Sequence, residues 1–443
     1  MRWMICIGAA LVAGVAFAAA LPPRGWGCLA WCCFMPLFWA VRGQGAFKGI
    51  ISGLAFGFAG ALTSISSLSA PVEIADSSIG WNLVGFGIYA VVLSILLGVL
   101  GEVRQVTLVG IARLAALGVL VEGLTFLKLP AQVALTQYDV WPMLRVASVT
   151  GAWGVSFLIW AANLLVLWEP WRQWRLAPAA AFGLASGLMA ASPPLDTFTA
   201  GEVAVVQAPG EGAAELLKMR TNTALIVWPE VSTQWFERGD LVLAARSGPA
   251  IVTSMHDDHR PKPHNAAYVF GVNGQSQPYY KRKPFGGESA IITAGDSPKV
   301  IEVGGTQIGL NICFDSCFPW VIRDTVRAGA QVIALPTLDP SSPNGFIQAV
   351  HGAMTPFRAA ELGVPILRSE WTAWSMIVDA DGRILSQAPT GWRGTLGTRE
   401  RLTSHPTLYR SLGDWFALLC GALVLSGLVL ERRDRKMSET CQQ

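Results

Sequence analysis

The sequence predicts an α+β protein in two parts, a polytopic helical membrane domain of about eight spans and a layered domain of strands and helices. Composition and its distribution along the chain predict this division. Of the 443 residues, 52% are hydrophobic and 14% are charged, whereas soluble proteins carry about 25% charged residues. The apolar excess lies in residues 1–195 and 411–430, while residues 200–408 have a globular composition. A net charge of +3 is too small to indicate a nucleic acid partner.

Several apolar segments are long enough to cross a bilayer, which takes about 20 helical residues. They are residues 3–21, 25–42, 47–68, 79–101, 106–127, 147–168, 176–193 and 412–430. We therefore expect a transmembrane domain over 1–195, a catalytic domain over 196–408, and a final span with a cytoplasmic tail over 409–443. The first segment also has the features of a cleaved signal peptide, but further spans follow at once and favour an uncleaved anchor.

Basic residues between the segments predict the orientation in the membrane. Arg42 with Lys48, Arg172 with Arg175, and the basic tail after residue 430 fall on one side of an eight-span chain. Positively charged loops remain in the cytoplasm. Both termini should therefore be cytoplasmic, and the polar domain should lie outside, in the periplasm of a bacterium with two membranes.

From residue 202 onward, short apolar runs replace the long segments. The runs are residues 203–206, 224–227, 250–252, 267–270, 308–312 and 332–335, and helical segments are expected at 319–329 and 354–362. Strands interleaved with helices predict an α/β or α+β layered domain.

Three reactive side chains follow such runs directly or closely. Glu230 ends Trp-Pro-Glu after the run 224–227, Lys281 follows a Tyr-Tyr pair, and Cys313 follows the run 308–312. A thiol needs a base to become a nucleophile, which a buried carboxylate can supply. A lysine ammonium can stabilise the oxyanion formed at a carbonyl carbon. The three types together predict acyl transfer through a thioester.

Two other groups of residues have weaker patterns. Cys317 lies four residues after Cys313 and would face it on a helix. A disulfide there would block the thiol, and we favour a small buried residue instead. The segment His256-Asp257-Asp258-His259, with His264 nearby, lacks a further ligand set, so we expect a polar loop and no metal.

Two further features have structural explanations. The segment Gly271–Gly274 lacks the strand and helix context of a phosphate loop and predicts a hairpin turn. Arg113 and Glu122 lie inside the fifth apolar segment. We expect them to reach the membrane surface or to pair with a neighbouring helix.

Together, the motifs resemble the nitrilase superfamily. Its signature combines Trp-Pro-Glu, Tyr-x-Lys with Pro-Phe-Gly and a following glutamate, and Ile-Cys with a nearby acidic residue and Phe-Pro. These motifs stand here at residues 228–230, 279–288 and 312–319. With seven spans before them and one after, the chain closely resembles the apolipoprotein N-acyltransferases over nearly its whole length. The resemblance implies a four-layer, nitrilase-like α-β-β-α sandwich.

The resemblance also implies residue roles. Glu230 would be the general base, Lys281 the oxyanion stabiliser and Cys313 the acylated nucleophile, while Glu288 would support the lysine. In that family a phospholipid donates an acyl chain to the cysteine, and the N-terminal amine of a lipoprotein accepts it. No metal and no organic cofactor are implied.

The chain also departs from the family pattern. The segment after Glu288 is short where the family has a lid, and the shortened spacing from Lys281 makes Lys283 a rival for the lysine role. Phe314-Asp315 replaces the commoner Tyr-Glu.

Three functions are consistent with these observations. The leading hypothesis is a lipoprotein N-acyltransferase of the bacterial inner membrane. The first alternative is a membrane-tethered amidase or acyltransferase with another acceptor, such as the nitrilase-like proteins encoded with conjugal-transfer systems. The second is a non-catalytic assembly module, which has no physical reason to retain all three reactive side chains.

Overall fold

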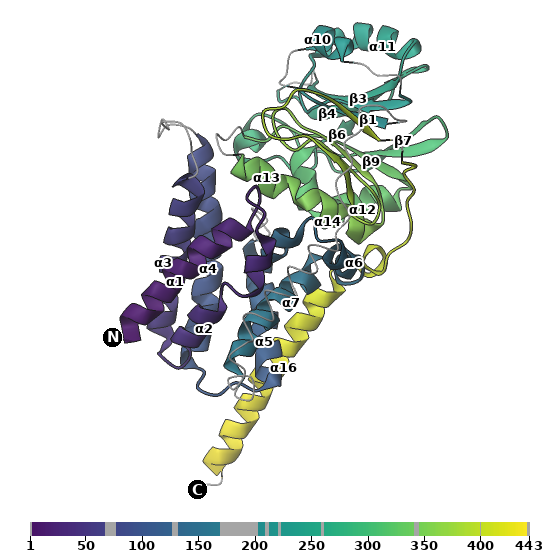
Figure 1. The fold of residues 1–443 in the computed structure, drawn as a ribbon. Helices are drawn as coiled ribbons and strands as arrows, with labels where there is room; N and C mark the ends of the chain where they lie inside the picture. Colours follow the sequence, from purple (N-terminus) through teal and green to yellow (C-terminus); the bar gives the residue numbers. More distant parts are fainter. Residues whose placement is uncertain are drawn as a thin grey trace. The chain divides into compact units, whose positions relative to one another are not determined.

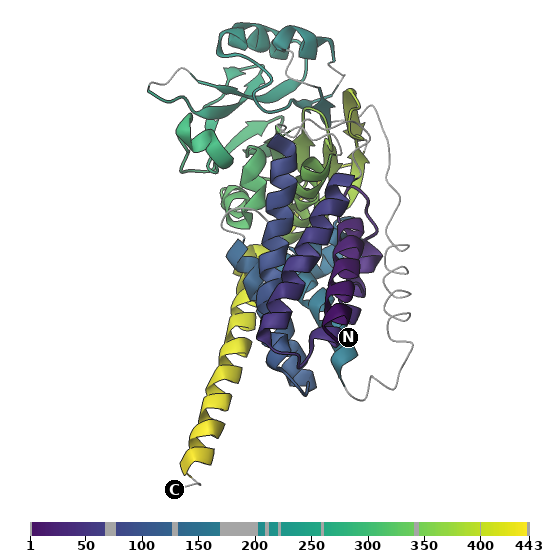
Figure 2. The same cartoon turned by 90° about the vertical axis from the view of Figure 1, so that its left-hand side faces the viewer.

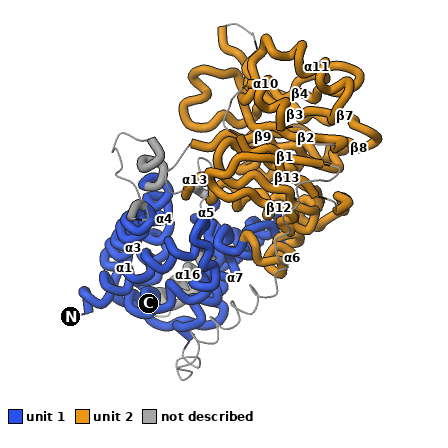
Figure 3. Tube along the Cα trace, turned by 45° about the horizontal axis from the view of Figure 1, so that its top comes forward, with its two compact units in different colours: residues 1–137, 150–191, 414–443 blue, residues 138–149, 192–413 orange. Residues whose placement is uncertain are grey.

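The computed structural model of the chain describes residues 2–66, 77–125, 132–168, 203–208, 212–219, 223–257, 261–340, 345–398 and 400–440. The chain divides into two compact units (Figure 3). The first contains residues 1–137, 150–191 and 414–443, and the second contains residues 138–149 and 192–413. The boundaries expected at 195 and 408 lie close to these, but residues 138–149 group with the second unit.

The described part of the first unit consists of helices (Figure 1). Their bounds are α1 Arg2–Ala20, η1 Gly27–Trp31, α2 Met35–Val41, α3 Ala46–Ser66, α4 Ser77–Glu102, α5 Leu108–Thr125, η2 Val133–Gln137, α7 Ala152–Leu164, η3 Leu165–Leu167 and α16 Trp415–Thr440. Among the described residues, three helices are long and apolar enough to cross a membrane, namely α1, α3 and α4. A fourth span results if α7 is counted together with the helix that precedes it, α6 Trp141–Thr150.

Two of the expected spans are wrong as single helices. Residues 25–42 form the short 3-10 helix η1 and then α2, because Pro36 lacks an N–H and is tolerated only in the first turn of a helix. Residues 147–168 are interrupted at Gly151, whose φ of +72° lies outside the helical region. The span expected at 176–193 lies outside the described residues.

Close packing of small residues holds α3 against α4. Gly49, Gly53 and Gly57 recur every four residues on α3, and a Cβ at each would lie 2.1–2.4 Å from an atom of α4. Such spacing lets two helix backbones approach closely where no hydrophobic effect drives association. Figures 1 and 2 show α1, α3 and α4 side by side.

Glu122 is buried inside this unit and has hydrogen-bond partners on neighbouring elements. One carboxylate oxygen accepts from the Trp160 indole N–H at 2.7 Å, and from the Val133 backbone N–H at 3.4 Å. The expectation that Glu122 pairs with a neighbouring helix is therefore confirmed.

The second unit contains two mixed β-sheets. The first has the order β13-β1-β2-β3-β4-β5, with β6 paired to β4, and the second has the order β12-β11-β10-β9-β8-β7. Strands β1–β3 are parallel to one another, as are β8–β10, and the other pairs are antiparallel. The strand bounds are β1 Val203–Gln207, β2 Leu225–Val227, β3 Ala250–His256, β4 Asn265–Gly271, β5 Gly274–Gln275, β6 Tyr279–Tyr280, β7 Lys299–Val303, β8 Thr306–Leu310, β9 Val332–Pro336, β10 Ile366–Ser369, β11 Met376–Val378, β12 Ile384–Gln387 and β13 Gly394–Thr398.

Helices cover the outer faces of both sheets (Figure 1). On the first sheet, α10 and α11 bury Leu216 and Leu241 against Tyr268 and Phe270. On the second sheet lie α12 and α14, and α13 packs against α14. The remaining bounds are α10 Ala213–Lys218, η4 Trp235–Glu237, α11 Arg238–Arg246, η5 Gly286–Ala290, η6 Cys313–Cys317, α12 Pro319–Arg327, α13 Phe346–Gly352, α14 Met354–Leu362 and α15 Leu408–Leu412.

The predicted elements of this unit are present. Each of the six apolar runs contributes to a strand, both expected helices form, and Gly271 and Gly274 flank the β4–β5 hairpin turn. The sequence pattern missed β6, β7 and β10–β13. Several of these strands are short, and β13 is rich in glycine and threonine, so none has a long apolar run.

Candidate active site

The site forms where strands of the two sheets end. Glu230 follows β2 and Cys313 follows β8, so both lie beyond the carboxyl ends of strands that have parallel neighbours. Lys281 follows β6 directly. The two sheets are tied together here, because the Glu230 backbone N–H donates to the Thr337 carbonyl at 3.3 Å, just past β9. Strand ends hold side chains in tight geometry.

Lys281 forms a buried ion pair with two glutamates. Its ammonium lies 2.8 Å from Glu230 and 2.7 Å from Glu288, and the side chains of Lys281 and Glu230 are 1% and 2% exposed. Burial lowers the pKa of Lys281, but the acidic groups beside it, chiefly the Glu230 carboxylate, more than offset this, so the pKa is raised overall. Lys281 is therefore a fixed positive charge inside the site.

Further donors hold the Glu230 carboxylate in place. Oε1 accepts from Asn265 Nδ2 at 2.6 Å as well as from Lys281, and Oε2 accepts from the Leu338 backbone N–H at 2.8 Å. The Trp371 indole N–H donates to the Glu230 backbone carbonyl at 2.6 Å. Both carboxylate oxygens thus have fixed positions.

Backbone strain lies at two positions of the site. Cys313 has a φ of +46°, and Val231, directly after Glu230, has a φ of +48°. Left-handed φ values are unfavourable for residues with a Cβ, most of all for a β-branched valine. The surrounding structure imposes these conformations on the two segments that carry the carboxylate and the thiol.

The Cys313 thiol points toward the segment after β9. Its Sγ lies 3.6 Å from the Leu338 carbonyl oxygen and 3.9 Å from Asp339 Oδ1. No hydrogen bond joins Cys313 to Glu230, both of which the structure describes. Burial raises the pKa of the Cys313 thiol, Glu230 and Asp339 raise it further, and Lys281 partly offsets them. The resting sulfur is therefore a protonated thiol.

In the structure, Lys281 and not its rival Lys283 contacts the Glu230 carboxylate. The Lys283 ammonium instead lies 4.5 Å from the Trp320 ring centroid and 5.3 Å from that of Phe318. Cys317 is buried and, like Cys313, is a free cysteine, so a disulfide does not block the thiol.

Asp315 organises the loops around the thiol. Its carboxylate accepts hydrogen bonds from the Tyr279 hydroxyl at 2.7 Å, the Ile312 N–H at 2.9 Å and the Lys283 N–H at 2.9 Å. Burial raises the pKa of Asp315 to about 6, although these bonds partly stabilise its charge. Asp315 thus joins the segment after β6, which carries Lys281, to the segment that carries Cys313.

Sequence reasoning missed a second charged cluster beside Cys313. Asp339 Oδ1 lies 2.5 Å from His351 Nδ1, and Asp339 Oδ2 accepts from Arg368 Nη2 at 2.5 Å. The other ring nitrogen of His351 lies 2.9 Å from Ser316 Oγ. A signal for Asp339 was present, because it follows the predicted run 332–335 as Glu230 and Cys313 follow theirs.

The described residues contain one set of potential metal ligands, Cys313, Asp339 and His351, whose ligand atoms lie within 4.8 Å of one another. These are residue types that bind zinc. Both oxygens of Asp339 already pair with His351 and Arg368, and the guanidinium would repel a metal cation. We therefore interpret the set as a hydrogen-bonded network.

The polar loop expected from the histidines at 256–264 contains a local pair between a histidine and an aspartate. His264 Nδ1 lies 3.0 Å from Asp257 Oδ2, and its ring stacks on Tyr280 with centroids 4.0 Å apart. Residues 258–260, including His259, lie outside the described residues.

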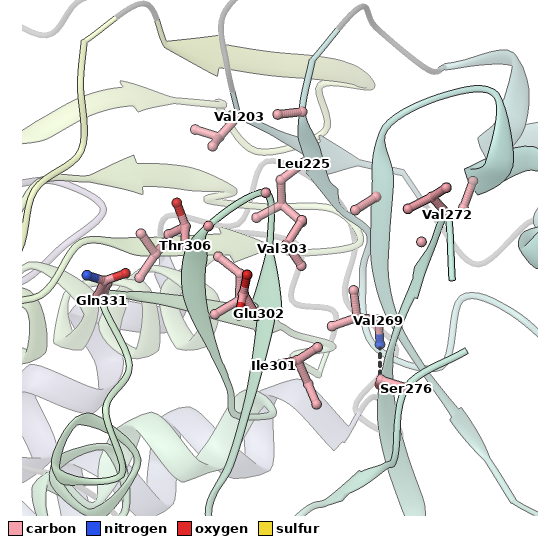
Figure 4. Close-up of a pocket in the computed structure, with 18 of the residues that line it drawn as sticks. Val203, Leu225, Val269, Val272, Ser276, Ile301, Glu302, Val303, Thr306 and Gln331 are labelled. Atoms are coloured by element: carbon pink, nitrogen blue, oxygen red, sulfur yellow. Dashed lines mark hydrogen bonds between the residues drawn. The ribbon is translucent and has the colours of Figure 1, made fainter. Parts of the chain in front are cut away.

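A large pocket of the second unit lies away from these residues (Figure 4). It is lined by Val203 and Leu225 at the starts of β1 and β2, and by the β7–β8 hairpin from Ile301 to Thr306. Those strand ends are opposite to the ends that carry Glu230 and Cys313. The pocket is thus separate from the candidate active site.

Two protein families match the chain. The carbon-nitrogen hydrolase family matches residues 146–400, and the N-terminal domain of apolipoprotein N-acyltransferase matches residues 13–165. Together the two matches extend from residue 13 to residue 400.

Individual relatives carry the same description. The chain is 28% identical to the apolipoprotein N-acyltransferase of Geobacter metallireducens. The alignment is 506 positions long and covers 96% of this chain and 95% of the relative. It is 26% identical to apolipoprotein N-acyltransferase 2 of Treponema denticola over 44% of this chain and 42% of that protein. It is 36% identical to the apolipoprotein N-acyltransferase of Gloeobacter violaceus over 29% of this chain and 25% of that protein.

Among solved structures, an amidase of the nitrilase superfamily from Nesterenkonia is similar. One mutant of it matches with a TM-score of 0.41 and 19% identity, over 49% of this chain and 96% of the amidase. Another, with acrylamide added at the active-site cysteine, matches with a TM-score of 0.39 and 21% identity, over 44% and 92%.

Proposed function

The chain belongs to the carbon-nitrogen hydrolase family and, within it, to the apolipoprotein N-acyltransferases, and we propose that it acylates lipoproteins at the membrane. A phospholipid would donate the acyl chain to Cys313, and the N-terminal amine of a lipoprotein would accept it from the thioester. The chain is a membrane protein with several apolar helices, and such a protein can reach two substrates that are both anchored in a bilayer.

One observation carries this proposal. Three side chains that lie far apart in the sequence, Glu230, Lys281 and Cys313, meet in one buried site. A thiol, a carboxylate and an ammonium are the groups that acyl transfer through a thioester requires. Burial of a lysine and a glutamate costs free energy even when the two are paired. A catalytic role would explain why the fold buries this lysine and this glutamate despite the cost in free energy.

In the first half-reaction, the Cys313 sulfur attacks the ester carbonyl of the phospholipid. The S–H turns from Leu338 and Asp339 toward Glu230, which takes the proton as the C–S bond forms. The Lys281 ammonium stabilises the oxyanion. When the intermediate collapses, the C–O bond breaks, and Glu230 returns the proton to the departing lysophospholipid oxygen.

In the second half-reaction, the lipoprotein amine attacks the thioester carbonyl. Glu230 takes a proton from the nitrogen as the C–N bond forms, and Lys281 again stabilises the oxyanion. The C–S bond then breaks, and the proton on Glu230 returns to the sulfur. The enzyme ends as it began, with a protonated Cys313.

We place the protein in the bacterial inner membrane, with the second unit in the periplasm and both termini in the cytoplasm. The distribution of basic residues along the sequence supports this orientation. The eight-span arrangement belongs to the proposal, since the described residues contain three or four candidate spans. The α-β-β-α layering of the family agrees with helices packed on both sheets.

The test uses cells depleted of their own acyltransferase that express the full chain. Mass spectrometry of a model lipoprotein should show one additional N-linked acyl chain. Without acceptor, purified protein given phospholipid should carry the acyl mass on the Cys313 peptide, and neutral hydroxylamine should remove it. Cys313→Ala should abolish both results.

Cys317→Ala is the matched control, because Cys317 is also buried and free but lies outside the proposed chemistry. If Cys313→Ala acylates lipoprotein as well as Cys317→Ala does, the nucleophile assignment is wrong. Protein without acyltransferase activity would favour the assembly role.

A second function keeps the thioester and changes the acceptor. The chain returns to the site soon after Glu288, because the Gly295 N–H already donates to the Lys281 carbonyl at 2.9 Å. This short connection favours a membrane-tethered amidase or acyltransferase that uses water or a small amine. This second function would be supported by an acyl-enzyme that forms on Cys313 but does not transfer its acyl chain to lipoprotein.

A further inference from the structure

A compact set of buried charged groups, separate from the Lys281–Glu230 pair, lies beside the Cys313 thiol. Asp339, which is 5% exposed, contacts the sulfur, and Arg368, which is fully buried, contacts Asp339. His351 bridges Asp339 and Ser316, and the Ser316 hydroxyl donates to the Cys313 carbonyl at 2.8 Å. The set thus contacts both the side chain and the backbone of Cys313.

We propose that Asp339 is a positioning residue for Cys313: it accepts the hydrogen bond of the resting thiol, and its charge, balanced by His351 and Arg368, sets how readily the thiol releases its proton. This inference rests on the nucleophile role proposed for Cys313 and adds a second carboxylate to its control. Glu230 remains the group that takes the proton during the reaction.

Hydrogen-bond geometry supports a separate place for each carboxylate. The Leu338 backbone contacts both Glu230 and the thiol, since its N–H donates to Glu230 Oε2 and its carbonyl oxygen lies 3.6 Å from the sulfur. Glu230 already accepts from Asn265, Lys281 and Leu338. The resting S–H therefore finds its acceptors on the Leu338–Asp339 side and must turn before Glu230 can receive the proton.

The donors around Asp339 show how its charge is balanced. Because Ser316 donates its only hydroxyl proton to the Cys313 carbonyl, its oxygen accepts from His351 Nε2. His351 Nδ1 faces the Asp339 carboxylate and donates to it. In this hydrogen-bond pattern His351 faces Asp339 and Ser316 with one ring nitrogen each, and Arg368 supplies a positive charge to Asp339.

The charged groups that face Cys313 come from several elements. Glu230 after β2, Asp339 after β9 and Glu288 in η5 disfavour a thiolate, while Lys281 after β6 favours one. Behind Asp339 lie His351 in α13, Arg368 in β10 and Glu370 after β10. Burial raises the pKa of Asp339, but His351 and Arg368 more than offset this, and the pKa is lowered. Asp339 is therefore an anion beside the thiol.

Two changes of opposite sign follow from this arrangement. Asp339→Asn removes a negative charge near the sulfur and should favour the thiolate. His351→Gln removes the imidazole that faces Asp339 Oδ1 and offsets its negative charge, and should disfavour the thiolate. A network with a merely structural role would move both variants in the same direction when it is disrupted.

The experiment measures alkylation of Cys313 by iodoacetamide, in which the thiolate displaces iodide. The full chain, in detergent micelles, is treated over a range of pH, and mass spectrometry of the Cys313 peptide gives the rate. For Asp339→Asn we expect the midpoint of the rate profile to fall by about one pH unit, which is about tenfold faster alkylation below the midpoint. For His351→Gln the midpoint should rise, and Asp339→Glu should stay near the wild type.

Asp257→Asn is the matched control, because Asp257 is also a buried aspartate paired with a histidine, His264, but does not contact the thiol. Its midpoint should not move. A midpoint for Asp339→Asn that is unchanged or higher overturns the inference. If Asp339→Asn does not fold, His351→Gln becomes the test. An unchanged or lower midpoint for His351→Gln then overturns the inference. Failure to acylate lipoprotein with these shifts present would instead refute only the proposed function.

Discussion

Glu230→Gln tests the proposed general base most directly. The change keeps the shape of the side chain and removes its ability to accept a proton. General acid–base catalysis contributes about 10²–10⁴-fold, so formation of the acyl-enzyme should slow by that factor. At about 1.4 kcal/mol for each tenfold change, the loss equals about 3–5.5 kcal/mol of activation free energy.

The same substitution should cost stability by a smaller amount. Glu230 accepts three hydrogen bonds, from Lys281, Asn265 and Leu338. The new amide group turns one accepting position into a donor, which leaves a buried donor unsatisfied at about 1–3 kcal/mol. The cost stays below the 3–5 kcal/mol or so of a fully broken buried pair, because Lys281 keeps Glu288 at 2.7 Å.

The assay is single-turnover acylation of Cys313 by phospholipid, with thermal unfolding of the same preparations. Glu361→Gln is the matched control, because Glu361 is a buried glutamate paired with Arg358 at 2.9 Å in α14, outside the proposed chemistry. That control should lose stability and still acylate. A folded Glu230→Gln protein that acylates Cys313 within about threefold of the wild-type rate would refute Glu230 as the base.

Three further predictions follow from the structure. Lys281→Met should reduce acyl-enzyme formation by at least about 100-fold, because it removes the cation beside the oxyanion, whereas Lys283→Met should change it little, and equal losses would contradict the assignment. Burial, with Asp339 adding to it, raises the pKa of Glu370 to about 7. Its protonated form therefore stabilises the fold below about pH 4, and this contribution is lost as pH rises toward 7. From pH 5 to pH 8 the wild-type unfolding temperature should thus fall more than that of Glu370→Gln, and parallel curves would be evidence against it. Finally, alkaline phosphatase fused after the last residue should be inactive, because basic segments stay in the cytoplasm, and an active fusion would reverse the proposed topology.

The amino-acid sequence alone predicted the division of the chain, the strand runs and the three reactive side chains. These features depend on local rules. A buried strand requires a short apolar run, a bilayer requires long ones, and Glu230 and Cys313 follow their strands directly. The sequence also showed that a thiol, a carboxylate and an ammonium suited to one reaction are present. It did not show how far apart these groups lie in the fold.

Only the tertiary structure decided which neighbours act together. Lys281 contacts Glu230 whereas Lys283 packs over Trp320, because that choice depends on how β6 pairs with β4. Asp339, His351 and Arg368 come from three separate elements and meet only when the second sheet forms. The break at Gly151 likewise depends on a backbone conformation that glycine permits but does not require. Contacts between distant segments are set by packing, and packing is a property of the whole fold.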